Sequence, residues 1–442
     1  MENILQHCRD IISKNPNLKI KFTRKVWETD FFRFFRSMTN YIISKRMTTL
    51  SCLVYSGKRS MNFSIMDPTV AKLDEKMKFV KEHIDSLPED PDFVDLEDNK
   101  EINIQKNVFN NIENYPSEKK INILKKLADD IDPLGFKLFG TFITNFVEYT
   151  LINSNGLDKT FSVSPLMLEV KAVNNKNDVT VIQSMGGYDP KGLDFDFFEE
   201  HLKEKIRMAD SDVIDMDAGK YDVILSPYAI GEFISYLTMG LNGHSIDSKR
   251  SFFLDKKGKK LFPEHINLFD DPLNEKMIPY PYNQDGYPLN KLPIITDGVL
   301  ENYFINNYYS HKLNMKKTGN MGTNLVLEPG KRSLDEMIGN VKKGLYISKL
   351  HYMNFMNARE TSVTGLTRDG TFLIEDGKIK NVVNNLRYTV KIADVVSNIT
   401  ELENTTHPVT GSGNYGEFDI YTAQMPHVRV KDFRISSSTH TI

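Results

Sequence analysis

The sequence predicts an α+β protein, with an N-terminal α/β domain followed by a β-rich C-terminal domain. Three observations predict this class. Segments with apolar residues at helical spacing alternate with strand-like runs through the first half of the chain. Beyond residue 250, Gly, Pro, Asn and Thr become denser and short alternating apolar runs dominate. The length of 442 residues suits two or three domains. We expect the domains to span residues 1–220 and 221–442, with the boundary near 210–250.

The first half contains helices and strands with clear end signals. Apolar residues at helical spacing predict a helix over residues 1–14, which Asn15-Pro16-Asn17 ends. Residues 48–66 predict a β-hairpin that turns at Ser56-Gly57. Asp67-Pro68 is expected to open a further helix with apolar residues from Val70 to Ile84 on one face. Helices are also expected around residues 117–130 and 195–208, and strands over 135–187. The aromatic run Phe31–Phe35 indicates a strand buried on both faces, with a stacking surface as the alternative.

The second half begins with a strand followed directly by a helix. Residues 221–226 form a short apolar strand, Pro227 follows, and residues 228–241 have the pattern of a helix. After residue 250 we expect a β-rich domain with many turns. Its clearest strands are residues 345–348, 371–374, 388–392 and 428–430.

Composition excludes several classes of function. The net charge of −3 gives no basic face for nucleic acid and no polybasic tail for a lipid surface. No apolar run approaches the roughly 18 residues of a membrane span, and the N-terminus lacks a signal peptide. Cys8 and Cys52 have no metal-binding spacing, which favours two free thiols. We therefore expect a cytoplasmic protein that contacts neither membrane nor nucleic acid directly.

Motif searches reveal no catalytic or metal-binding constellation. None of the ten histidines is three or four residues from another, so no helix presents two imidazoles to one ion. The chain also lacks a GxSxG motif, a P-loop and a dinucleotide-binding glycine motif. From these residues we predict no catalytic side chain and no metal ligand. A site assembled from distant histidines stays open.

Short motifs in collinear order resemble the TldD/PmbA family, also called the modulator of DNA gyrase family. They include NSNG, AGKYDVILSP, TGN and the IEDGKI segment. The matching segments are residues 153–156, 218–227, 251–258, 269–272, 285–286, 318–320, 324–330, 364–365, 374–379 and 426–430. Each is short, but their common order over residues 150–435 is specific. The resemblance implies the family fold and an activity related to metallopeptidases.

Active TldD-type members of this family carry HExxxH on the central helix and a further cysteine ligand near the C-terminus. The resemblance places the histidine positions at about Ser235 and Gly240 and the base position at Tyr236. Glycine has no donor atom, serine is a poor neutral ligand, and tyrosine is a weak base near neutral pH. No cysteine follows Cys52. The chain therefore resembles the PmbA/TldE branch, which lacks the motif.

Membership of that branch implies a non-catalytic subunit that binds no cofactor itself. Its expected partner is a TldD-type zinc peptidase, or a second copy of this chain, and its expected substrate is a peptide that undergoes proteolysis or maturation. The family motifs also imply a substrate groove lined by Thr318, Gly319, Asn320, Thr364 and Gly365. Two alternatives remain at this point: an independent metallopeptidase with an unrecognised site, and a homodimeric protein that binds a peptide or small ligand.

Overall fold

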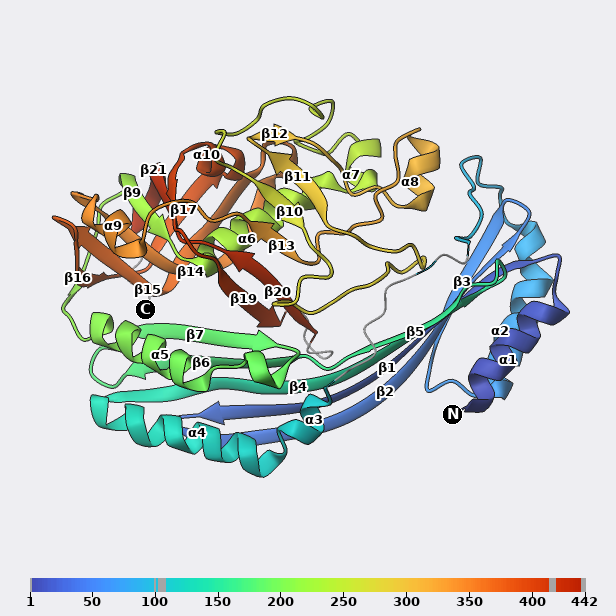
Figure 1. Cartoon of the computed structure of the whole chain (residues 1–442), viewed down its shortest axis with the longest axis horizontal. Helices are drawn as coiled ribbons and strands as arrows, with labels where there is room; N and C mark the ends of the chain where they lie inside the picture. Colours follow the sequence, from blue (N-terminus) through green and yellow to red (C-terminus); the bar gives the residue numbers. More distant parts are fainter. Residues whose placement is uncertain (1, 99–100, 102–108, 413–418, 439–442) are drawn as a thin grey trace.

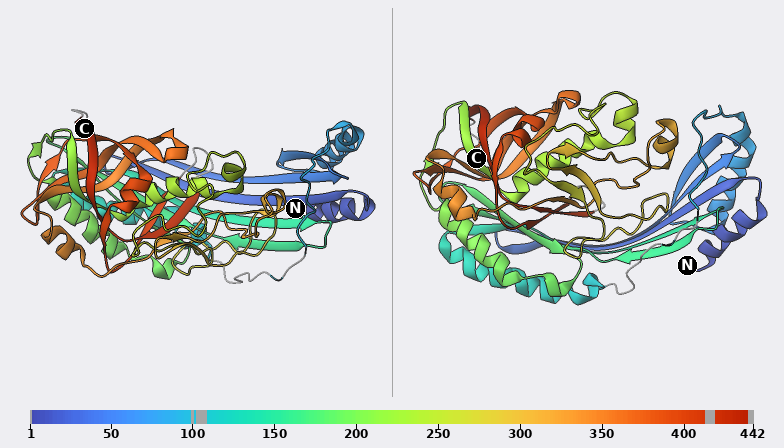
Figure 2. Two further views of the ribbon diagram at one scale, coloured as in Figure 1. Left: turned by 90° about the horizontal axis from the view of Figure 1, so that it is seen from above. Right: turned by 45° about the horizontal axis from the view of Figure 1, so that its top comes forward.

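The computed structural model describes residues 2–98, 101, 109–412 and 419–438. A long, curved N-terminal sheet forms one layer, and the C-terminal half is stacked on one end of it (Figure 1). The strands of this sheet extend well beyond the C-terminal half toward the N-terminal helices, as the two further views show (Figure 2). Helices and strands are mixed and the C-terminal half is rich in strands, so the predicted α+β class is confirmed.

The N-terminal sheet has seven strands, in the order β3-β2-β1-β4-β6-β7, with β5 also paired to β4. All of these pairings are antiparallel. The predicted hairpin is confirmed: its strands are joined at Gly57, whose φ is 57°. The strands are β1 (Lys19–Phe35), β2 (Met38–Ser56), β3 (Arg59–Met66), β4 (Phe136–Asn153), β5 (Asp158–Val163), β6 (Leu166–Asn174) and β7 (Thr180–Gly187).

The amphipathic helices predicted for the first half are confirmed, and they cover the two ends of the sheet (Figure 1). At one end, α1 (Glu2–Lys14) and α2 (Val70–His83) form a core with Phe22 and Leu50. At the other end, α4 (Ser117–Ile131) and α5 (Phe195–Ala209) pack around Phe142. The short elements of this half are η1 (Ile84–Ser86), α3 (Asn111–Asn114), η2 (Asp132–Leu134) and η3 (Pro190–Gly192).

The larger C-terminal sheet closes on itself. Its strands follow the order β14-β9-β21-β17-β15-β16-β8, and β14 also pairs with β15, so five strands form a ring. β18 adds to β21. The strands are β8 (Val213–Ile214), β9 (Gly219–Leu225), β14 (Lys343–Asn357), β15 (Ser362–Glu375), β16 (Lys378–Val383), β17 (Leu386–Lys391), β18 (Ile399–Leu402) and β21 (Val428–Ser438). η5 (Ala358–Glu360) and α10 (Ile392–Ser397) connect some of them.

A second C-terminal sheet of six short strands lies beside the ring, in the order β12-β11-β10-β13-β20-β19. Helix α6 (Pro227–Thr238) lies in the core that the two sheets share. The strands are β10 (Leu268–Asp270), β11 (Leu292–Thr296), β12 (Val299–Leu300), β13 (Leu325–Leu327), β19 (His407–Ser412) and β20 (Ile420–Met425). The short helices are η4 (Met239–Leu241), α7 (Gly243–Asp247), α8 (Asn307–Lys312) and α9 (Leu334–Gly339).

Partly buried ion pairs join the two halves. The Asp369 carboxylate on β15 lies 2.7 Å from Lys171 Nζ on β6 and accepts a hydrogen bond of 2.7 Å from Thr180 Oγ1 on β7. On the neighbouring strands, Lys349 Nζ lies 3.1 Å from Glu169 Oε2. These contacts fix the C-terminal half over β6 and β7, and pockets remain on both sides of this junction.

One expectation for the sheet is wrong in part. Phe31, Phe32 and Phe34 are buried as predicted, but Arg33 and Phe35 are exposed, Phe35 by 46%. Arg33 and Phe35 border an open pocket, which Lys349, Thr410 and Tyr421 of the C-terminal half also line, instead of a closed core.

Both cysteines are free and buried in the core between α1, α2 and the sheet. Burial raises the pKa of the Cys8 thiol to about 12 and that of Cys52 well above its ordinary value. Because the thiolate is the reactive form, neither thiol should react with Ellman's reagent in the native protein at pH 8. Both should react within minutes in guanidinium chloride. Rapid release of thionitrobenzoate from the native protein would contradict this burial.

Among the described residues, no helix is long and apolar enough to cross a membrane.

Candidate functional site

The helix that carries the family motif positions begins directly after a buried strand. β9 ends at Leu225, and Ser226 caps α6 by accepting a hydrogen bond of 3.3 Å from the backbone N–H of Ala229. Pro227 occupies the first turn, where its missing N–H and fixed φ suit a helix start. Phe233 and Ile234 face the shared core, and on the opposite face of α6 Glu232 and Tyr236 are half-buried while Ser235 is exposed. We call this partly covered side the open face of α6.

The three motif positions lie on or just beyond this open face, but they offer no metal site. Ser235 is exposed, and Gly240 in η4 has only a backbone carbonyl, which accepts a hydrogen bond from Ser251 Oγ. The Tyr236 hydroxyl donates to the carbonyl of Met353. Burial and the neighbouring Glu232 carboxylate raise the pKa of Tyr236 above its ordinary value, which suits it poorly as a base. The donor set does not fit the zinc that the family motif would hold.

Glu232 and His244 are further polar residues on or near this helix. Burial raises the pKa of Glu232, against the opposing charge of Lys349. His244 is exposed on α7, and its Nδ1 lies 3.0 Å from the Tyr309 hydroxyl. In the part of the chain that the structure describes, these two residues do not join any group of three metal-ligating side chains.

The first predicted groove segment is a tight, well-bonded turn. Thr318 Oγ1 donates to the Tyr303 carbonyl at 2.9 Å and accepts from the Ile305 N–H at 2.9 Å. Gly319 has φ 78°, and a Cβ there would lie 2.4 Å from the Tyr287 ring. The buried Asn320 amide donates to the Asp270 carboxylate at 3.1 Å.

The second predicted groove segment lies elsewhere, near the start of β15. Thr364 Oγ1 donates to the Tyr388 carbonyl at 3.0 Å. A Cβ at Gly365 would lie 2.3 Å from the Tyr388 hydroxyl oxygen, so glycine allows this ring to pack closely. Thr318 lines a pocket beside Asn302 and Met315, and neither Thr364 nor Gly365 lines that pocket. The two segments therefore have local structural roles, and they do not border one pocket. Their predicted part in a substrate groove stays a prediction.

A different set of side chains meets at the junction of the two halves. Glu403 Oε2 lies 2.8 Å from His407 Nε2 and 2.7 Å from His427 Nδ1. One ligand atom from each of the three residues lies within 4.8 Å of the others, and no other such group occurs among the described residues. Glu403 follows β18, His407 begins β19, and His427 lies between β20 and β21.

The electrostatics of this cluster favour a carboxylate beside neutral imidazole. Burial alone would raise the pKa of Glu403, but hydrogen bonds from His407 and His427 hold it well below its ordinary value. Burial lowers the pKa of His427, against the opposing effect of the Glu403 carboxylate. The far nitrogen of His427, Nε2, lies 3.1 Å from the hydroxyl of buried Tyr346.

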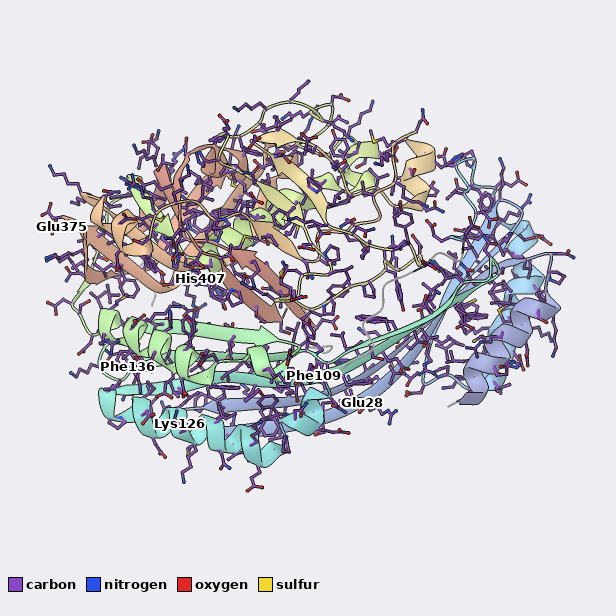
Figure 3. The ribbon with its side chains drawn as sticks, in the orientation of Figure 1. Glu28, Phe109, Lys126, Phe136, Glu375 and His407 are labelled. Atoms are coloured by element: carbon purple, nitrogen blue, oxygen red, sulfur yellow. The ribbon has the colours of Figure 1, made fainter. Side chains whose placement is uncertain are left out.

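The two histidines of this cluster line a pocket of about 440 Å³ between α5, β7 and the C-terminal half. Figure 3 shows His407 where the C-terminal half meets the sheet. The polar side chains around the pocket include Asp194, His201, Glu204, Lys205 and Tyr228. A concave pocket with convergent polar groups is the usual form of a ligand site.

Sequence reasoning did not find this cluster. His407 and His427 are 20 residues apart, so they do not form a histidine pair at helical spacing. Glu403 and His407 are four apart, but they stand in a turn and a strand instead of on a helix. The sequence pattern that could have indicated the cluster is Glu403 and His407 on either side of a short turn, with His427 after a proline. That pattern is too common to select a site without the strand pairing.

Comparison with known proteins gives a family. The family model described as "PmbA/TldA metallopeptidase C-terminal domain" matches residues 218–437. The zinc metalloprotease TldD homolog of Saccharolobus solfataricus is 24% identical over 355 residues, which cover 73% of this chain and 77% of that protein. The metalloprotease PmbA of Escherichia coli O157:H7 is 25% identical over 190 residues, which cover 42% of this chain and 41% of that protein.

Two solved structures share the fold over nearly the whole chain. TldE from Thermococcus kodakarensis has a TM-score of 0.86 and 18% identity, with 98% of this chain and 100% of that chain covered. A protein described as a putative modulator of DNA gyrase, from Bacteroides thetaiotaomicron, has a TM-score of 0.84 and 18% identity, with 99% of both chains covered. The predicted resemblance is confirmed: the chain belongs to the TldD/PmbA family.

Proposed function

We propose that this chain is a TldE/PmbA-like subunit without a metal at the family's motif position, and that it assembles with a TldD-type zinc peptidase in cytoplasmic peptide proteolysis or maturation. The observation that carries this proposal is the set of residues at the motif positions on and just beyond α6. Serine, tyrosine and glycine stand at the motif positions, and the tyrosine hydroxyl is already bonded to a backbone carbonyl. Zinc would be held by the partner.

An exposed apolar surface beside α6 supports assembly. Tyr236 contacts Phe355 with ring centroids 5.1 Å apart, which places the end of β14 next to the open helix face. On these two elements and at the helix end, Met239 is 50% exposed, Tyr352 75% and Met356 64%. Exposed aromatic and methionine side chains are enriched at protein interfaces, so these residues near α6 are candidates for contact with a partner.

The test measures peptide cleavage by three samples: this chain alone, a TldD-type chain from the same genome alone, and their mixture. We expect cleavage to require the TldD-type chain and to rise in the mixture, with a heteromer visible by light scattering. Met356→Glu should weaken assembly at least tenfold, because a charge would be buried in the interface. The matched control is Phe79→Glu, at an exposed phenylalanine on α2. Assembly of this chain only with itself would contradict the proposal.

An independent metallopeptidase is the second candidate, and the Glu403–His407–His427 cluster favours it. Two histidines and a glutamate are a ligand set of catalytic zinc sites in peptidases. If this chain alone cleaves peptides and His407→Ala abolishes the cleavage, this candidate is established. The proposal of a non-catalytic subunit is then rejected.

A further inference from the structure

Glu403, His407 and His427 bring one carboxylate and two imidazole rings together, with a ligand atom from each within 4.8 Å of the others. One carboxylate oxygen, Glu403 Oε2, faces an imidazole nitrogen from each of two other elements. We propose that these three side chains bind a divalent transition-metal ion of the zinc class, through Glu403 Oε2, His407 Nε2 and His427 Nδ1. This site is separate from the motif positions on α6, and the inference goes beyond the proposed subunit role and does not depend on it.

The donor atoms suit such an ion in kind and in spacing. Imidazole nitrogen together with one carboxylate selects zinc and similar first-row ions over calcium or magnesium, which prefer oxygen ligands. With bonds of about 2.0–2.2 Å, tetrahedral ligands lie roughly 3.3–3.5 Å apart. In the structure, Glu403 Oε2 forms hydrogen bonds of 2.8 Å with His407 Nε2 and 2.7 Å with His427 Nδ1. A small outward movement of the side chains would admit the ion.

Tyr346 is placed to support the metal-bound form of His427. Ligation through Nδ1 requires the proton of the neutral ring to move to Nε2. The Tyr346 hydroxyl oxygen lies 3.1 Å from Nε2 and can accept that hydrogen bond. A partner of this kind fixes the tautomer and orientation of ligating histidines in most metal sites. Tyr346 would thus act as a positioning residue.

The backbone holds all three ligands on rigid segments. The Glu403 N–H donates to the His427 carbonyl at 2.9 Å, and the Glu403 carbonyl accepts from the Gly330 N–H at 2.6 Å. His407 pairs with Met425 at the start of the β19–β20 ladder. Because each ligand is anchored by backbone bonds to a neighbouring strand or turn, little ordering is needed when an ion binds.

The pocket side of the cluster leaves room for a further ligand. Three protein ligands leave a position for water or substrate in a tetrahedral site. His407 and His427 line the pocket of about 440 Å³, so this position can face it. The carboxylates of Asp194 and Glu204 and the ammonium of Lys205 line the same pocket. Two carboxylates and one ammonium line the pocket, and the Glu403 carboxylate belongs to the cluster beside it, so the local charge favours a cation.

Cobalt(II) tests the site directly, because tetrahedral coordination produces visible d–d absorption bands. The full chain is freed of metal with a chelator and titrated with Co²⁺, and then Zn²⁺ is added in competition. We expect one Co²⁺ per chain with visible bands that Zn²⁺ removes. His407→Ala and Glu403→Gln should each weaken binding by about 100-fold or more, and Tyr346→Phe by about 10- to 100-fold.

The matched control is His201→Ala, which removes an imidazole from the same pocket but outside the cluster. It should leave Co²⁺ binding unchanged, and circular dichroism should show that every variant is folded. Failure of the native chain to take up Co²⁺ would overturn the proposal, as would equal binding by the native, His407→Ala and Glu403→Gln proteins. The subunit role is tested by cleavage and assembly instead of metal content, so the two proposals can fail separately.

Discussion

Replacing Phe233 by alanine is expected to lower the free energy of unfolding of the C-terminal half by about 3–5 kcal/mol. Phe233 lies on α6 and is fully buried. Its ring centroid lies 5.7 Å from that of Tyr388 on β17 and 6.1 Å from that of Phe433 on β21. The substitution leaves a cavity between the helix and two strands of the closed ring, and these strands cannot move inward without breaking their pairing.

Urea denaturation followed by tyrosine fluorescence and circular dichroism measures this loss. The matched control is Phe79→Ala on α2, which removes the same side chain from an exposed position and should change stability by less than about 0.5 kcal/mol. Equal losses for the two variants would mean that α6 is not anchored in the ring. The burial of Phe233 also explains why α6 is present in the fold although it carries no metal ligands: its apolar side chains fill the core shared by the two C-terminal sheets.

The helices could be predicted from sequence because their signals are local. For α2, Leu73, Met77 and Val80 recur at helical spacing, and the structure buries all three. For α6, the strand, proline and apolar run predicted the start of the helix to within one residue. Such patterns depend only on neighbours within one or two turns, so one sequence is sufficient.

The closed ring of strands could not be predicted in the same way. β9 pairs with β14 in parallel across about 120 residues, for example Asp222 with Gly344, and with β21 across more than 200. A Cβ at Gly344 would lie 2.1 Å from the Asp222 carbonyl oxygen, so glycine is needed for this close approach. The residues around Gly344 do not indicate which strand it pairs with, because strand pairing depends on the whole fold.

The candidate site depends on the same long-range pairing. His407 reaches Glu403 across a turn, but His427 arrives only because β20 runs back along β19 and Pro426 directs the chain into β21. The family motifs lie on α6, which carries Ser235 and Tyr236. The polar cluster lies on other elements, where the sequence shows only separate histidines. Motif comparison therefore identified the family and missed these three residues.

Asp369→Asn is expected to destabilise the contact between the two halves by roughly 2–4 kcal/mol at pH 7, because it removes the buried carboxylate of an ion pair whose lysine is partly exposed. The Asp369 side chain is 6% exposed, whereas Lys171 keeps some access to water, which limits the loss. Asparagine is chosen because Asp369 has φ 55°, a conformation that asparagine tolerates. The hydrogen bond from Thr180 can persist, so the change tests mainly the charge.

The pH dependence distinguishes this charge effect from a packing effect. Burial would raise the pKa of Asp369, but Lys171 and the hydrogen bonds lower it below the ordinary value. A carboxyl group with a lowered folded pKa adds stability that is present above its unfolded pKa of about 3.9 and is lost as the pH falls through the folded value. The difference between native and variant proteins should therefore be constant from pH 5 to 8 and shrink below pH 4. Glu82→Gln, in an exposed pair with Lys78, should show no such difference. A loss that is the same at pH 3.5 and pH 7 would show that Asp369 acts through shape alone, and the pocket between the halves would then not depend on this ion pair.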